Sequence, residues 1–145
     1  MIVQPYLDFG GKCEQAIEFY KKALGAKVEA VMRFKDAPDP EMLKMCPPGS
    51  DDKIMHASLT FGKSVVMMSD GMGTGTPKFA GITLSIGLQK EADADRYFNA
   101  LADGGKVVMP LSKTFWSPRF GMVTDKFGVA WMINVEGPKP ALAPK

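Results

Sequence analysis

Two stretches of this chain, one in each half, resemble each other closely enough to predict an internal duplication. The first, EFYKKALGAKV at residues 18–28, matches RYFNALADGGKV at residues 96–107, and a Phe-Gly pair recurs at 61–62 and 127–128. The two matches lie closer together in the second half because only the first half contains a long Pro-rich loop. A chain of 145 residues with one such repeat is expected to be a single domain made of two similar modules.

The hydrophobic pattern of the first half predicts a strand, a helix and three further strands. Apolar residues recur every three or four positions within residues 12–24, as in an amphipathic helix, and Gly25 is a typical helix stop. The segment 35–52 holds four prolines and predicts a long loop with one helical turn at 41–45. Segments rich in β-formers predict strands at 2–9, 28–34, 53–61 and 64–70.

The second half follows the same order, so the fold class that we expect is α+β with two βαβββ modules. A helix is predicted at 91–102. Strands are predicted at 81–88, 106–112, 119–124 and 129–135. We assign the first module to about residues 1–70, a linker to about 71–79, the second module to about 80–136, and a loosely held tail to 137–145.

The charge pattern excludes two classes of partner. Lys and Arg number 18 against 16 for Asp and Glu, and the two signs alternate along the chain, so neither nucleic acid nor a membrane is expected as a partner. Cys13 and Cys46 lie in dissimilar settings and are predicted to be free thiols. With no signal peptide and no long apolar run, a cytoplasmic location is expected.

Two segments carry a family resemblance. PYLDFGGKCEQAIEFYKKALGA at residues 5–26 and DKFGVAWMIN at residues 125–134 resemble the glyoxalase/bleomycin-resistance, or vicinal oxygen chelate, superfamily, within its PhnB-like (demethylubiquinone methyltransferase-like) branch. The resemblance implies two curved sheets that face each other around a cleft, with the helices outside, and a homodimer. Both segments describe how strands meet helices and turns, so they are specific for fold and weak for chemistry.

The resemblance also locates the positions that bind a metal in metal-dependent relatives, where His or Glu side chains from four strands point into the cleft. The matching positions here are Gln4, Met67, Gly81 and Met132. Glycine supplies no side chain and thioethers prefer soft ions, so we predict no metal and no cofactor. The sequence also lacks a strand–Gly-rich loop–helix unit for S-adenosylmethionine, which argues against methyltransferase activity.

Strand alternation predicts which side chains line the cleft. Val3, Leu7 and Phe9 are expected to face the helix, which turns the residues between them toward a ligand. Trp116, beside Phe115, could stack on a flat or cationic ligand, or pack over a dimer interface or sheet edge. The predicted ligand-binding residues are Gln4, Tyr6, His56, Met67, Ser69, Thr83, Ser85, Trp116, Met122, Met132 and Asn134.

The chemistry of the chain stays open at this point. His56, the sole histidine, is a weak candidate for a general base, and the alternative is a structural histidine. Asp8 and Asp70 could join it in a metal site or an acid–base pair, or cap turns. The favoured hypothesis is a metal-independent small-molecule binding protein. The alternatives are a divergent lyase or dioxygenase-like enzyme, metal-dependent or using His56, and a purely assembling protein.

Overall fold

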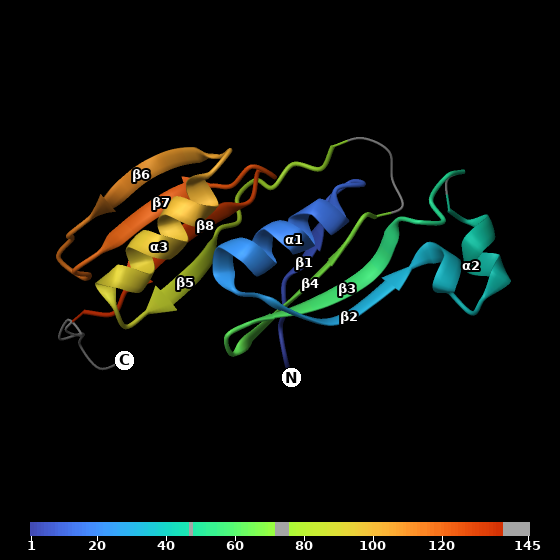
Figure 1. Ribbon diagram of the computed structural model, residues 1–145, viewed down its shortest axis with the longest axis horizontal. Coiled ribbons are helices and arrows are strands. Elements are labelled where there is room, and N and C mark those ends of the chain that lie inside the picture. The colour runs from blue at the N-terminus through green and yellow to red at the C-terminus, as the bar shows by residue number, and fades with distance from the viewer. Residues whose placement is uncertain (47, 72–75, 138–145) are drawn as a thin grey trace. The chain divides into compact units, whose positions relative to one another are not determined.

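The computed structural model describes residues 1–46, 48–71 and 76–137 and contains two compact units, Met1–Pro77 and Lys78–Lys145 (Figure 1). Each unit repeats the order strand, helix, three strands, which confirms the predicted α+β fold and the two βαβββ modules. Part of the predicted linker at 71–79 and most of the predicted tail at 137–145 lie outside the described residues. No helix in the described part of the chain is long and apolar enough to cross a membrane.

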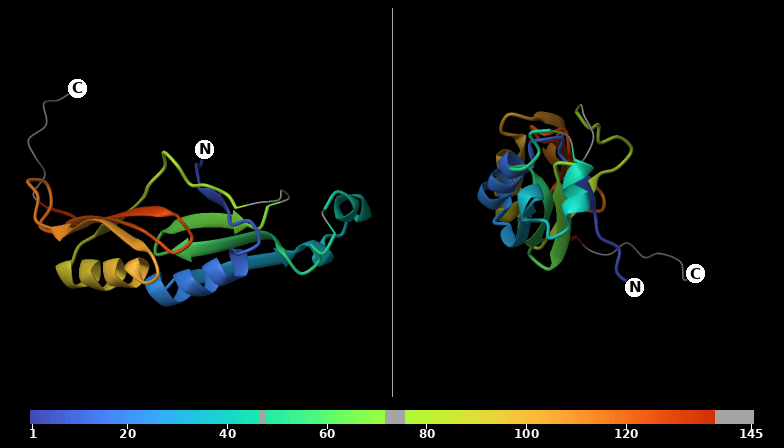
Figure 2. Two further views of the ribbon diagram at one scale, coloured as in Figure 1. Left: turned by 90° about the horizontal axis from the view of Figure 1, so that it is seen from above. Right: turned by 90° about the vertical axis from the view of Figure 1, so that its right-hand side faces the viewer.

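The first unit is a four-stranded sheet with one long helix along one face (Figure 2). Its strands pair in the order β1-β4-β3-β2, with β1 parallel to β4 and the other neighbours antiparallel. In chain order the elements are β1 (Tyr6–Asp8), α1 (Cys13–Leu24), β2 (Lys27–Arg33), a 3-10 turn (Phe34–Asp36), α2 (Pro40–Lys44), β3 (Ile54–Phe61) and β4 (Ser64–Ser69). The helix and the sheet together bury an apolar core that includes Leu7, Ile17, Tyr20, Ala57, Leu59, Val66 and Met68.

The second unit repeats this plan with the strand order β5-β8-β7-β6, in which β5 runs parallel to β8. Its elements are β5 (Leu84–Leu88), α3 (Glu91–Ala102), β6 (Lys106–Ser112), β7 (Phe120–Thr124) and β8 (Ala130–Val135). The helix α3 contributes Ala94, Phe98 and Leu101 to the core, and the sheet contributes Val123, Trp131, Ile133 and Val135. Asp125 is 3% exposed and accepts hydrogen bonds from the Phe127 and Val129 amides and from the Trp131 indole, so it stabilises the β7–β8 turn.

Two strands begin later than the sequence predicts. The first starts at Tyr6, and Val3, which we expected to face the helix, is 90% exposed. Pro5 has no amide hydrogen to donate, so the ladder between β1 and β4 starts after it. The strand predicted from residue 81 starts at Leu84, and Gly81 has a φ of 73°, which is outside the extended region.

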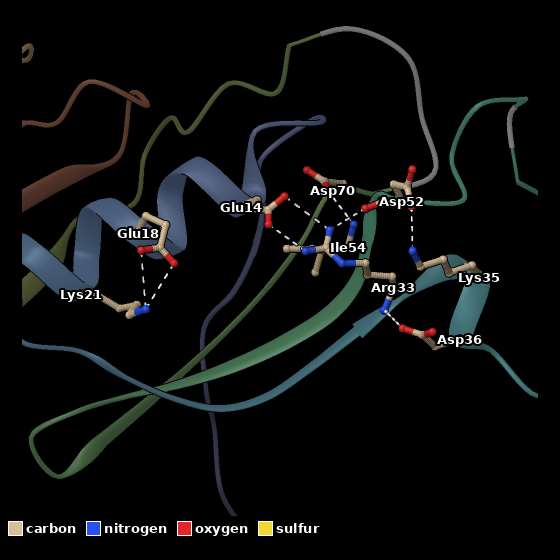
Figure 3. Close-up of polar contacts among 9 residues, drawn as sticks. All are labelled: Glu14, Glu18, Lys21, Arg33, Lys35, Asp36, Asp52, Ile54 and Asp70. Carbon is tan, nitrogen blue, oxygen red and sulfur yellow. Dashed lines mark hydrogen bonds and ion pairs between the residues drawn. The ribbon is translucent and has the colours of Figure 1, made fainter.

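A buried carboxylate fixes the start of α1. The residue before the helix, Lys12, makes no capping bond with its side chain. Instead one carboxylate oxygen of Asp70 accepts a hydrogen bond from the Cys13 amide, and the other accepts one from the Ile54 amide, both at 2.8 Å (Figure 3 shows the bond to Ile54). Asp70 therefore ties the first turn of α1 to the start of β3 and to the end of β4.

Ion pairs lie at the base of the Pro-rich loop (Figure 3). The loop carries helix α2, which has no buried residue. The Arg33 guanidinium binds the Glu14 carboxylate at 2.7 Å and the Asp52 carbonyl at 2.6 Å, and the Lys35 ammonium lies 2.9 Å from the Asp52 carboxylate. The hydrogen bond and charge of Arg33 lower the pKa of Glu14 below its ordinary value of 4.5. Those of Lys35 lower the pKa of Asp52 below its ordinary value of 3.8.

We expect these ion pairs to be lost on acidification. A lowered pKa in the folded protein means that the carboxylates stabilise the fold above their unfolded-state pKa values, and that this contribution disappears as the pH falls through the folded values. Carboxyl carbon shifts followed by NMR should give titration midpoints below 4.5 for Glu14 and below 3.8 for Asp52. Arg33→Gln should raise the Glu14 midpoint, whereas a Glu14 midpoint of 4.5 in the unmodified protein would contradict the pairing.

Candidate ligand-binding faces

Each sheet has one face turned away from the core that it forms with its helix, and these two faces hold most of the predicted ligand-binding residues. On the first sheet the register places Tyr6 beside Met67, and Met67 beside Ser58. His56 lies on the same side, opposite Met32 of β2. We call this set, Tyr6, Met32, His56, Ser58 and Met67, the first face.

On the first face Tyr6 and His56 form a direct contact. The Tyr6 hydroxyl lies 3.0 Å from Nδ1 of His56, and the two rings are 5.5 Å apart between centroids with an interplanar angle of 42°. The same hydroxyl is 3.5 Å from the Met55 carbonyl. Tyr6 is 51% exposed and His56 is partly buried, so a molecule in solution can approach the pair.

The other polar residues that we predicted near His56 are engaged elsewhere. Ser69 is 6% exposed, and its hydroxyl accepts a hydrogen bond from the Gly71 amide. The Asp8 carboxylate accepts one from the Gly10 amide and fills the space that a Cβ at Gly71 would need. Asp8 binds the Gly10 amide two residues on, which agrees with the turn-capping alternative, whereas Asp70 binds the amides of Cys13 and Ile54 and caps the start of α1 instead of a local turn. Gln4 is partly buried and precedes β1.

The second sheet carries a more apolar set. Met132 of β8 lies between Ser85 of β5 and Met122 of β7, and Asn134 lies between Gly87 and Phe120. Thr83 is partly buried and precedes β5. We call Ser85, Phe120, Met122, Met132 and Asn134 the second face.

Asn134 has an unusual environment on the second face. Its amide oxygen Oδ1 is buried, and no donor among the described residues reaches it. A buried acceptor without a donor costs stability unless another group satisfies it. The Asn134 oxygen therefore needs a donor that these residues do not supply.

Phe115, Trp116 and Phe120 form an aromatic group at the end of the second face. The Trp116 ring packs edge-on against the Phe120 ring, with 5.2 Å between centroids, and against the Phe115 ring, with 4.7 Å between centroids. Trp116 is 37% exposed and Phe115 is 90% exposed. Trp116 thus contacts a strand of its own sheet, and part of its ring remains accessible. Phe120 was not among the predicted ligand-binding residues, although strand alternation with Met122 places it on this side.

Ser117 fixes the loop that carries these rings. Its side chain is 3% exposed, and its hydroxyl lies 2.8 Å from the Arg119 carbonyl and 2.7 Å from the Val135 carbonyl. Gly137 has no room for a side chain, because a Cβ there would lie 2.8 Å from the Trp116 carbonyl oxygen. These contacts constrain the backbone next to Trp116, whose ring packs against Phe120.

The residues that the family resemblance assigns to the metal-binding positions do not fit a divalent metal. Gln4, Met67, Gly81 and Met132 offer an amide, two thioethers and no imidazole or carboxylate. Within the described ranges, no three His, Cys, Asp or Glu side chains come together in a way that could hold an ion.

Both cysteines are free thiols, and burial, helped by the Asp70 carboxylate, raises the pKa of Cys13.

Comparison with known proteins agrees with this architecture. The sequence profile described as "Glyoxalase/Bleomycin resistance protein/Dioxygenase superfamily" matches residues 6–133. Protein YjdN of Escherichia coli K12 is 40% identical over 145 residues, which cover 97% of this chain and 99% of that protein.

Two solved structures are also similar to this chain. Protein PA1353 of Pseudomonas aeruginosa has a TM-score of 0.82 at 43% identity and covers 94% of this chain and 98% of its own. A Bacillus cereus protein named PhnB, a "putative 3-demethylubiquinone-9 3-methyltransferase", has a TM-score of 0.76 at 26% identity, covering 93% and 99%.

Proposed function

Because the chain belongs to the glyoxalase/bleomycin resistance protein/dioxygenase superfamily, in its PhnB-like branch, we propose that it binds a small organic molecule without a metal ion. The observation that carries the proposal is the aromatic group at the second face, where the partly exposed Trp116 packs against Phe120 and Ser117 constrains the backbone next to it. Ordered aromatic rings provide a large contact area at a small cost in conformational entropy. The thioethers of Met122 and Met132 add an adaptable apolar surface beside them.

The chemistry of the second face favours a partly aromatic ligand with one hydrogen-bond donor. The aromatic group suits a flat apolar portion, and Oδ1 of Asn134, which no described residue pairs with, suits a hydroxyl or amide hydrogen. A thermal-shift screen of flat, neutral molecules with and without such a donor tests this. A ligand present at 100 times its Kd should stabilise the protein by about 2.7 kcal/mol. A library that stabilises nothing would contradict the proposal.

The second candidate function is metal-free acid–base catalysis by His56. The observation in its favour is the Tyr6 hydroxyl at 3.0 Å from Nδ1, since a second group that orients a histidine is typical of catalytic histidines. This function requires a free lone pair on the nitrogen that faces the substrate. It would be supported if His56→Ala abolished a reaction that the protein catalyses, and excluded if such a reaction continued at an unchanged rate.

We further propose a homodimer in which a second copy covers the exposed edge strands. Val28 and Val31 of β2 are 38% and 43% exposed, although they lie beside the buried Leu59 and Ala57. On β6, Val107 and Val108 are 44% and 56% exposed. Uncovered apolar edges of this kind favour association.

Light scattering coupled to gel filtration tests the dimer. We expect twice the 15.7 kDa mass of one chain. Val31→Asp together with Val108→Asp should reduce the mass to that of one chain, because a charge at each position would be costly to bury in an interface. A single-chain mass for the unmodified protein would contradict the proposal.

A further inference from the structure

The Tyr6–His56 contact restricts the protonation of the imidazole. A neutral imidazole carries one hydrogen, and the hydrogen bond made by one ring nitrogen decides which nitrogen carries it. If Nδ1 accepts from the Tyr6 hydroxyl at 3.0 Å, the hydrogen of His56 lies on Nε2. If Nδ1 instead carried the hydrogen, it would donate to the phenolic oxygen, a weaker acceptor than an imidazole nitrogen, and the exposed hydroxyl would donate to solvent or to the Met55 carbonyl at 3.5 Å. The first arrangement makes the better bond.

The second ring nitrogen is left available. Nε2 of His56 has no hydrogen-bond partner among the described residues, and the ring is only partly buried. With the hydrogen on Nε2, the first face presents an oriented N–H donor whose direction is set by Tyr6. Such a nitrogen has no free lone pair, so it can donate a hydrogen bond but cannot act as a general base.

We propose that the Tyr6–His56 pair is a binding subsite for a neutral oxygen acceptor, such as the carbonyl of an amide or a ketone, on the ligand of this protein. The inference rests on the proposed small-molecule binding and names a chemical group that the ligand carries. The Nε2 hydrogen donates to the ligand oxygen, and Tyr6 orients the ring.

The surroundings favour a neutral acceptor over an anion. The strand register places Asp8 two residues from Tyr6 on the same side of β1, opposite Ser69 of β4. Its carboxylate would repel a second negative charge at this end of the first face. Met67 and Met32, which flank the pair on β4 and β2, provide apolar contacts for the rest of the ligand.

Nitrogen-15 NMR of the ligand-free protein, prepared without a histidine tag, tests which nitrogen of His56 carries the hydrogen. His56 is the sole histidine, so every imidazole signal belongs to it. We expect a pyrrole-type signal for Nε2 and a pyridine-type, hydrogen-bonded signal for Nδ1. Tyr6→Phe should move the Nδ1 signal to the position of a free acceptor, and the control Tyr97→Phe in α3 should leave both unchanged. A hydrogen on Nδ1 would overturn the inference and favour the general base.

Titration with benzamide and benzoate tests whether Nε2 of His56 binds a neutral carbonyl oxygen. Benzamide should shift the Nε2 signal, benzoate should shift it less, and Tyr6→Phe should weaken benzamide binding about fivefold, the effect of losing one orienting hydrogen bond. An Nε2 signal that does not respond to benzamide would overturn the subsite. Compounds found in the thermal-shift screen would in that case still support small-molecule binding, so the two proposals fail separately.

Discussion

Replacing Asp70 with alanine should lower the free energy of unfolding by about 3 kcal/mol, because the change leaves two backbone amides without their acceptor. The carboxylate is 6% exposed and accepts from Cys13 and from Ile54, each at 2.8 Å. Solvent cannot replace it without entering the junction between α1 and β3. Urea denaturation followed by circular dichroism measures the loss.

Two further variants make this prediction specific. Asp70→Asn keeps one acceptor oxygen and should lose about half as much stability as alanine. Asp51→Ala removes a nearby exposed carboxylate, and such surface changes usually alter stability by less than about 0.5 kcal/mol. Equal losses for Asp70→Ala and Asp51→Ala would show that Asp70 does not fix the helix start.

Replacing Trp116 with alanine should weaken the binding of compounds found in the screen by about tenfold or more, because large aromatic side chains contribute most of the affinity at many binding sites. The fold should persist, since Trp116 lies in a loop and is 37% exposed. Isothermal titration calorimetry measures the affinity, and thermal denaturation of the free protein checks the fold. Trp116→Phe should recover part of the affinity.

Variants at Tyr97 and Ser117 distinguish the loss of a ring that contacts the ligand from the loss of a residue that positions that ring. Tyr97→Ala removes an aromatic ring from α3, outside both faces, and should leave the affinity unchanged. Ser117→Ala keeps the Trp116 ring but removes the hydroxyl that lies within hydrogen-bond distance of the Arg119 and Val135 carbonyls. It should weaken binding less than Trp116→Ala and lower the steady-state anisotropy of the tryptophan fluorescence. Unchanged affinity in Trp116→Ala would exclude the aromatic group from the site.

The fold was predictable because local patterns and the repeat agree. The helix predicted at 91–102 is α3, Glu91–Ala102, and each half has the strand–helix–three-strand order. The errors lie at the first strand of each unit, where the predicted strand starts too early. There, residues with high β-propensity lie next to a residue that cannot take part in the strand pairing. In the first unit that residue is Pro5, which has no amide hydrogen to donate. In the second unit Gly81 has a positive φ, and β5 starts three residues after it, at Leu84.

Strand alternation predicts the side of the sheet on which a residue lies, but not the residue that it contacts. It placed Tyr6 and His56 on the same side. Their contact, however, joins residues 50 positions apart and depends on β1 pairing with β4, which pairs with β3. The bond from Cys13 to Asp70 spans 57 positions for the same reason. Local spacing carries no information on such pairs, and none on whether the oxygen of Asn134 finds a donor.

Native mass spectrometry of the untagged protein, alone and with a compound from the screen, tests metal-independent binding most directly, because it resolves metal ions and organic ligands by mass in one spectrum. The free protein should show no metal, and the compound should bind in a defined ratio that chelators do not change. A divalent metal retained in a one-to-one ratio, with ligand binding lost on its removal, would contradict the assignment of Gln4, Met67, Gly81 and Met132 as positions that hold no metal.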